Sequence, residues 1–301
     1  MAEYSSTRDF IGYGSKAPAV RWPGGARVAV SFVLNFEEGG EFSITDGDPR
    51  NEAVYEVVDQ QPVADPCIDT HFEYGTRVGW RRVADVFSRF GAALTLSSCG
   101  RAVQRSPWLA QDAVQRGHEV SAHGYRWERH ATMDEATERK AIAASAKAIE
   151  DATGKPPVGW HTRSSPSPNT RRLLAEMGFV YDSDAYNDDT PYFVQAAGRR
   201  HLVLPYAFDT NDMHFQHSDR FTTAGDFSTY VCDAYDWLER EGEHWPRMLS
   251  VGLHLRMIAR PGRIGALEAI LEHITSRGTA WVATRAAIAG HWIEHSPSAV
   301  K

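Results

Sequence analysis

Long apolar runs and cysteines are both scarce in this chain. Its 301 residues contain no run of 18 apolar residues, so no helix is expected to cross a membrane. The three cysteines, Cys67, Cys99 and Cys232, are odd in number and far apart. That spacing excludes a disulfide framework and does not match a zinc motif, whereas it fits a reducing compartment. Residues 1–6 lack the apolar core of a signal peptide, so we expect a cytoplasmic protein.

Basic charge is scarce as well. Lysine and arginine number 32 against 39 acidic residues, the formal net charge is -7, and no basic face is clustered. This balance excludes nucleic acid as the expected partner. Linkers, internal repeats and low-complexity tracts are also missing, while 42% of the residues are hydrophobic, enough to fill a large core. We therefore expect one domain over residues 1–301, with residues 1–25 as an N-terminal arm.

Short apolar segments alternate along the chain with longer segments of helical periodicity. Strands are expected at residues 27–34, 92–98, 119–122, 158–162, 179–182, 202–208, 248–254 and 279–282. Helices are expected at residues 74–90, 107–116, 134–153, 169–177, 223–241, 263–277 and 285–295. Strands that are apolar throughout indicate a parallel sheet buried on both faces. Seven or eight such units predict an α/β fold in which the sheet curls into a (β/α) barrel.

Polar side chains follow six of the expected strands. In strand order they are Asn35, Glu37 and Glu38; His123; His161 and Arg163; Asp182 and Asp184; Asp209, Asn211 and Asp212; and His254 and Arg256. Each group alone has a structural explanation, because 209–212 is also a good turn sequence and His161 could simply pack. Barrel enzymes, however, gather their chemistry at the carboxyl ends of the strands. The convergence of these side chains therefore predicts an active site.

His123 and Trp127 are spaced four residues apart, as two histidines on one side of a metal ion would be. An indole has an N–H donor and no lone pair to offer a metal. The segment therefore has the form of a metal site that has lost a ligand.

Several motifs resemble those of a known family. Residues 27–32, 121–124 and 252–254 resemble motifs of the polysaccharide deacetylase (NodB-like) superfamily. Residues 35–41, 123–127, 181–184, 209–213 and 254–261 are similar to its metal-independent branch of allantoinases and cyclic imide hydrolases. The resemblance implies a distorted barrel of seven to eight (β/α) units, hydrolysis of a non-peptide carbon–nitrogen bond, and a homo-oligomer.

Metal-dependent relatives in this superfamily use a motif aspartate and a His-x-x-x-His pair. His123 matches the first histidine, and Trp127 stands in place of the second. The motif aspartates fall at Val33 and Asn35 if the first strand aligns without a gap, or are replaced by Glu37 and Glu38 if it is shifted. At least one ligand is missing in either case, so we expect no catalytic metal and no other cofactor.

The resemblance implies a small cyclic amide as the binding partner and ring opening of a cyclic ureide or imide, such as allantoin, as the reaction. We assign Glu37 or Glu38 as the base and His123 and His254 as acid–base partners, with Asp209 orienting a histidine. The expected substrate-binding side chains are Asn35, Trp127, Arg163, Asn211 and Arg256.

Two alternatives remain open at this point. One is a metal-dependent de-N-acetylase of an acetylated sugar or polysaccharide, which would need zinc and a third ligand such as His71 or His130. The other is a non-catalytic barrel. The 161–168 loop and His71 also depart from the allantoinase pattern, which leaves the identity of the cyclic amide open.

Overall fold

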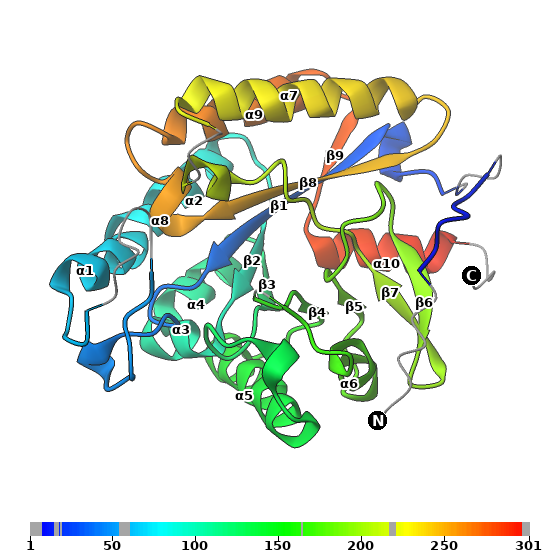
Figure 1. The fold of residues 1–301 in the computed structure, drawn as a ribbon. Coiled ribbons are helices and arrows are strands. Elements are labelled where there is room, and N and C mark those ends of the chain that lie inside the picture. The colour runs from blue at the N-terminus through cyan, green and yellow to red at the C-terminus, as the bar shows by residue number, and fades with distance from the viewer. Residues whose placement is uncertain are drawn as a thin grey trace.

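The computed structural model describes residues 8–14, 18, 20–53, 61–163, 165–216 and 221–296. Its centre is a curled, nine-stranded sheet built around β1 (Val28–Phe36), every residue of which is buried (Figure 1). The strand order is β6-β7-β5-β4-β3-β2-β1-β8, and β9 pairs with the first residues of β1. All pairs are parallel except β6 with β7. The expected α/β barrel is therefore confirmed in a distorted form.

The remaining strands are β2 (Thr95–Ser98), β3 (Glu119–Ala122), β4 (Gly159–Trp160), β5 (Tyr181–Asp182), β6 (Tyr192–Ala196), β7 (Arg199–Val203), β8 (Arg247–His254) and β9 (Ala280–Val282). The helices are α1 (Pro66–Tyr74), α2 (Trp80–Arg89), α3 (Gly100–Arg105), α4 (Pro107–Gln115), α5 (Glu135–Thr153), α6 (Thr170–Glu176), α7 (Ala224–Glu241), α8 (Leu255–Ile258), α9 (Ile264–Ser276) and α10 (Arg285–His295). In Figure 1, α7 and α9 lie over β8 and β1, while α4 and α5 flank β3.

The sheet closes through loops and one buried arginine. Asn211, which follows β7, makes an isolated parallel bridge with Gly252 of β8. Arg285 is buried and donates to the hydroxyls of Ser183 and Ser250 and to the carbonyl of Pro205. A buried guanidinium needs such acceptors for its N–H groups. Arg285 thereby links β8 to the side of the sheet formed by β5 and β7, and in the described residues the only strand pairing across that gap is the isolated bridge.

Several expected element bounds were wrong. The strand placed at 202–208 is β7, which lies at Arg199–Val203 and forms an unexpected hairpin with β6. Ala197 and Gly198 make its turn in the left-handed conformation, with φ of 52° and 71°. An Ala-Gly pair is not among the pairs that typically mark such a hairpin turn in a sequence. β1 runs to Phe36, so Asn35 lies inside the strand rather than after it. Helices α1, α3 and α8 were not expected.

The described part of the expected N-terminal arm packs on the barrel. Val20 and Trp22 are buried, and the Trp22 ring lies 5.9 Å from Trp281 and 5.5 Å from Trp292, measured between ring centroids.

Of the helices in the described residues, none has the length and apolar character needed to cross a membrane.

Candidate active site

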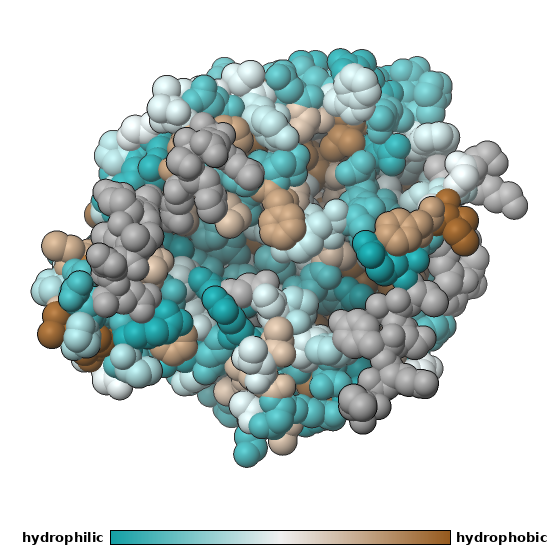
Figure 2. Space-filling model, viewed as in Figure 1, coloured by the Kyte–Doolittle hydropathy of each residue, from teal (hydrophilic) through white to brown (hydrophobic). Residues whose placement is uncertain are grey.

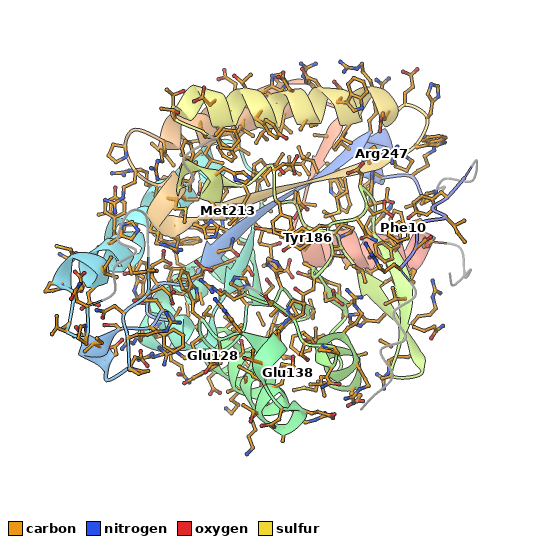
Figure 3. All side chains as sticks on the ribbon, viewed as in Figure 1. Phe10, Glu128, Glu138, Tyr186, Met213 and Arg247 are labelled. Atoms are coloured by element: carbon orange, nitrogen blue, oxygen red, sulfur yellow. The ribbon has the colours of Figure 1, made fainter. Side chains whose placement is uncertain are left out.

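A cavity of about 230 Å³ lies at the carboxyl ends of the strands. The face drawn in Figure 2 is hollowed near its centre, in the region where Figure 3 labels Met213 and Tyr186, which both line this cavity. Eight of the ten residues expected at the site line it: Asn35, Glu37, His123, Trp127, Arg163, Asn211, His254 and Arg256. Glu38 and Asp209 do not line it. Tyr186, Tyr206 and Phe208 line it although they were not expected there, and so does His161, which was named after an expected strand but given no role in the site.

Glu37 lies between a histidine and an arginine. Its Oε1 is 3.3 Å from His123 Nε2, and its Oε2 accepts a hydrogen bond of 2.8 Å from Arg256 Nη1. All three side chains are buried. Burial alone would raise the pKa of the Glu37 carboxyl, but the Arg256 guanidinium and the hydrogen bond from His123 hold that pKa well below its usual range. Glu37 is therefore a carboxylate at neutral pH.

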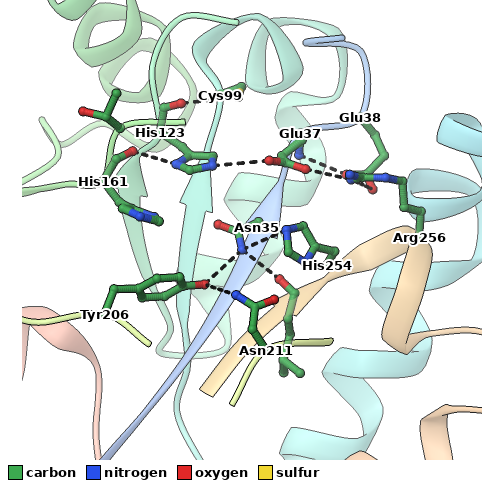
Figure 4. Close-up of polar contacts among 12 residues, drawn as sticks. Asn35, Glu37, Glu38, Cys99, His123, His161, Tyr206, Asn211, His254 and Arg256 are labelled. Atoms are coloured by element: carbon green, nitrogen blue, oxygen red, sulfur yellow. Dashed lines mark hydrogen bonds and ion pairs between the residues drawn. The ribbon is translucent and has the colours of Figure 1, made fainter. Parts of the chain in front are cut away.

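The hydrogen bonds of His123 determine where its protons lie. His123 Nδ1 is 2.6 Å from the carbonyl oxygen of His161, which can only accept, so Nδ1 carries a proton (Figure 4). Its Nε2 faces the ionised Glu37 carboxylate, which also can only accept. We infer that a proton on Nε2 would be directed to Glu37. This side chain is thus arranged as a proton donor.

His254 has the opposite arrangement. Its Nδ1 is 2.6 Å from Oδ1 of buried Asp212, and the other Asp212 oxygen accepts from the His254 backbone N–H at 2.9 Å. Nδ1 therefore carries the proton, and Nε2 is left with its lone pair, 3.5 Å from Asn35 Nδ2. An aspartate that fixes the tautomer of a histidine in this way prepares its other nitrogen to act as a base.

The expected role of Asp209 is corrected by this geometry. Asp209 is exposed, and its carboxylate accepts a hydrogen bond of 3.1 Å from Tyr230. Asp212, three residues later, orients the histidine instead. The turn sequence 209–212 offers two aspartates, and the bridge from Asn211 to Gly252 of β8 places the second beside His254.

The cavity floor is a set of hydrogen-bonded polar side chains. Asn35 Nδ2 donates to the Leu253 carbonyl at 3.1 Å and to the Tyr206 hydroxyl at 3.3 Å. Asn211 Nδ2 lies 3.5 Å from the same hydroxyl. Gly252 permits this approach, because a Cβ there would lie 2.5 Å from the Tyr206 hydroxyl oxygen and 2.3 Å from Asn211 Nδ2.

One cavity wall carries donors suited to a carbonyl oxygen. The Arg163 guanidinium lies over the Trp127 ring, 3.6 Å from its centroid. The buried Trp127 Nε1–H has no hydrogen-bond partner in the described part of the chain. Among the described residues the wall is completed by His161, which stacks on His123 at 5.0 Å between centroids. Burial, with the positive charges of His123 and Arg285, holds the pKa of His161 well below its usual range, so His161 is neutral.

Glu38 faces away from this cavity. It lines a second cavity of about 220 Å³ on the other side of Arg256, whose Nη1 is 3.5 Å from Glu38 Oε1. The carboxylate is accommodated over Gly75, where a Cβ would lie 2.5 Å from Glu38 Oε1. Burial, opposed by Arg256 and reinforced by the charge of Glu37, raises the pKa of Glu38 to about 7. Of the two neighbouring glutamates, only Glu37 meets the site.

Glu38 gives the stability of the protein a distinct pH dependence. Its pKa is raised from 4.5 to about 7 on folding, so its contribution to the unfolding free energy is fully present below pH 4.5 and is lost as the pH rises through 7. Glu38→Gln mimics the protonated form and is expected to flatten this decline. Urea unfolding midpoints between pH 4.5 and 8 measure it. Glu73→Gln, at an exposed position lining the same cavity, is the control, and equal slopes in wild type and Glu38→Gln would contradict the assignment.

The donor set does not suit a metal ion. Among the residues that the structure describes, no group of three or more His, Cys, Asp or Glu side chains is placed to hold one. A cation beside Glu37 would also share that carboxylate with the Arg256 guanidinium. The third ligands considered for a zinc site lie elsewhere: His71 Nδ1 is 3.2 Å from Arg260 Nη2, and His130 Nδ1 is 3.1 Å from Glu138. Zinc sites require at least three protein ligands, which these residues do not provide.

Comparisons with known proteins show which proteins this chain is similar to. The family model described as polysaccharide deacetylase matches residues 60–181. A protein of Schizosaccharomyces pombe, whose name assigns it to the polysaccharide deacetylases, is 36% identical over 97% of this chain and 98% of its own length. The solved structure of PuuE allantoinase is 43% identical, covers 97% of this chain and 99% of its own, and superposes with a TM-score of 0.92. A Pseudomonas aeruginosa protein, named a probable polysaccharide deacetylase, is likewise 43% identical with a TM-score of 0.92, covering 97% of this chain and 100% of its own.

Proposed function

Because this chain belongs to the polysaccharide deacetylase family, whose hydrolases act on carbon–nitrogen bonds, we propose that it opens the ring of a cyclic ureide or imide without a metal ion. The observation that carries the proposal is the pair of histidines with opposite proton arrangements. His254, held by Asp212, presents a lone pair, and His123, held by Glu37 and a carbonyl, presents a proton. Two titratable groups held apart in this way are the acid and the base of a hydrolysis.

The first step is attack by water. His254 Nε2 takes one proton from a water molecule, and Asp212 stabilises the imidazolium that results. The water oxygen forms a bond to the ring carbonyl carbon, and the carbonyl electron pair moves onto its oxygen. The unpartnered Trp127 N–H and the Arg163 guanidinium beside it are the donors that hold this oxyanion.

The second step is ring opening. The carbon–nitrogen bond breaks, its electron pair goes to the ring nitrogen, and that nitrogen takes the proton from His123 Nε2. The new carboxylic acid loses its proton to solvent, so the product carries a carboxylate at one end and the released N–H at the other. His254 is left with one proton more and His123 with one fewer, and exchange with solvent restores both.

Two features favour a small activated ring as the substrate. The cavity of about 230 Å³ is smaller than the about 300–1,000 Å³ of sites for drug-sized ligands. In place of a metal ion, the site offers hydrogen-bond donors to the oxyanion. Such donors stabilise the oxyanion of an unactivated acetamide less than a Lewis acid does. The similarity to PuuE allantoinase supports the same substrate class.

A substrate panel tests this proposal. Hydantoin, allantoin and succinimide are incubated with the purified protein beside an N-acetylated chitooligosaccharide. Ring opening of at least one cyclic compound is expected, with no release of acetate. Acetate release from the sugar would instead support the de-N-acetylase alternative, and the absence of any turnover would support a non-catalytic barrel.

A further inference from the structure

A third and larger cavity adjoins the candidate active site. It has a volume of about 570 Å³ and lies between the loops that follow β5 and β7 on one side and α7 and β8 on the other. Three residues line both this cavity and the site cavity, and all three are aromatic: Tyr186, Tyr206 and Phe208. These side chains therefore form the wall between the two spaces.

Two of the three rings form a partition that is partly exposed, and the Tyr186 hydroxyl lies 3.5 Å from His161 Nε2. Tyr206 is buried and held by Asn35, whereas Tyr186 and Phe208 are 44% and 56% exposed. Their rings stack face to face, with centroids 3.7 Å apart and planes inclined by 10°. Both lie on irregular loops, and Tyr186 is labelled near the centre of the open face in Figure 3. We refer to Tyr186 and Phe208 as the aromatic partition.

The larger cavity has a distinct chemistry. Its polar lining includes the carboxylates of Asp188, Asp189 and Asp209, and no lysine, arginine or histidine of the described residues lines it. Trp237 and Leu238 of α7 supply an apolar side. A space of this kind suits a substrate substituent that is apolar along its length and ends in a positive charge. It disfavours a substituent that ends in a carboxylate.

We propose that the aromatic partition determines substrate size by closing the ring pocket, and that the larger cavity beyond it is a subsite for ring substituents ending in a cation. This inference rests on the proposed ring-opening function. The closed partition confines the reaction to small rings because a substituent at the ring edge would meet Tyr186 or Phe208. Removing one ring of the partition joins the two cavities.

The experiment compares three hydantoins: unsubstituted, carrying an aminobutyl chain, and carrying a carboxyethyl chain. The value of kcat/KM for each substituted ring is divided by that for the unsubstituted ring, in wild type, Phe208→Ala and Tyr186→Ala. The aminobutyl ratio is expected to rise about 10–100-fold in the alanine variants, because removal of a steric barrier is worth that much in a closed pocket. The carboxyethyl ratio is expected to rise less.

Two matched variants serve as controls. Tyr186→Phe removes the hydroxyl and its contact with His161 but keeps the stacked ring, so the ratios are expected to stay at wild-type values even if the rate for every ring changes. Trp245→Ala removes an exposed aromatic side chain that lines neither cavity, and the same result is expected. Because the readout is a gain in one ratio, a poorly folded variant cannot imitate it.

The outcomes separate this inference from the proposed function. Unchanged ratios in both alanine variants, with hydantoin still opened, would overturn the partition alone. Equal gains for both substituents would overturn the assignment of the larger cavity to cations. If no ring is opened by any variant, the proposed function fails, and calorimetric titration decides the partition. The partition then predicts a 10–100-fold tighter Kd for the aminobutyl ring in Phe208→Ala, about the same factor as in kcat/KM, and an unchanged Kd would overturn it.

Discussion

Replacement of Asp212 by asparagine is expected to lower kcat for ring opening by about 10³–10⁴-fold. Asp212 accepts hydrogen bonds from both Nδ1 and the backbone N–H of His254. An asparagine amide would present an N–H to one of these positions and would favour the tautomer in which Nε2 carries the proton. His254 would then have no lone pair for water. Steady-state kinetics on a hydantoin, with circular dichroism to verify folding, measure the effect.

Asp209→Asn is the matched control for this substitution. Asp209 lies three residues earlier, is exposed, and accepts a hydrogen bond from Tyr230 rather than from a histidine. Its substitution is expected to leave kcat for unsubstituted hydantoin close to wild type. Similar losses in the two variants, or a loss only in Asp209→Asn, would show that the histidine is not activated through Asp212.

Replacement of Glu37 by glutamine is the second change with a large expected effect. Glu37 holds the proton donor His123 and is paired with buried Arg256 at 2.8 Å. A neutral amide no longer offers an anionic acceptor to His123 Nε2, so kcat is expected to fall about 10²–10⁴-fold. Removing one partner of a buried ion pair also costs about 3–5 kcal/mol of unfolding free energy. Kinetics and urea unfolding at pH 7 measure the two effects separately.

The leaving nitrogen provides a specific readout of this role. If Glu37 acts through His123 as the acid, the loss in Glu37→Gln shrinks for rings whose departing nitrogen is more acidic, because that nitrogen needs less protonation. Glu38→Gln is the control, since Glu38 lines the other cavity, and a much smaller loss of kcat is expected. A loss that is the same for every leaving nitrogen would assign Glu37 to the fold rather than to proton transfer.

The sequence predicted the barrel and most of the site because strand periodicity and strand ends are local signals. Apolar strands such as residues 27–34 are recognisable, and barrel geometry brings the side chains that follow them together. These local signals do not predict which of two neighbouring side chains after a strand faces the site. Glu37 and Glu38 are neighbours, yet one faces the site and the other faces a second cavity, because successive side chains beyond a strand point in opposite directions.

Contacts between distant segments account for the remaining differences. Asp212 was passed over for Asp209 because only the bridge between Asn211 and Gly252 decides which aspartate reaches His254. His161 was assigned to packing, since nothing in its local sequence reveals that its carbonyl binds His123. Tyr206 fell inside a strand expected at 202–208, whereas β7 ends at Val203 and leaves Tyr206 free to turn toward Asn35. These relations depend on tertiary packing rather than on periodicity.

The central claim is that amino-acid side chains alone activate the water and hold the oxyanion. The most direct measurement is the rate of opening of hydantoin, or of the best ring in the panel, by protein that has been dialysed against a chelator and whose metal content has been determined. A site built on His254, Asp212, His123 and Glu37 predicts full activity in the metal-stripped protein and no increase on addition of Zn²⁺. Activity that is lost with the chelator and restored by Zn²⁺ in proportion to the metal bound would contradict it.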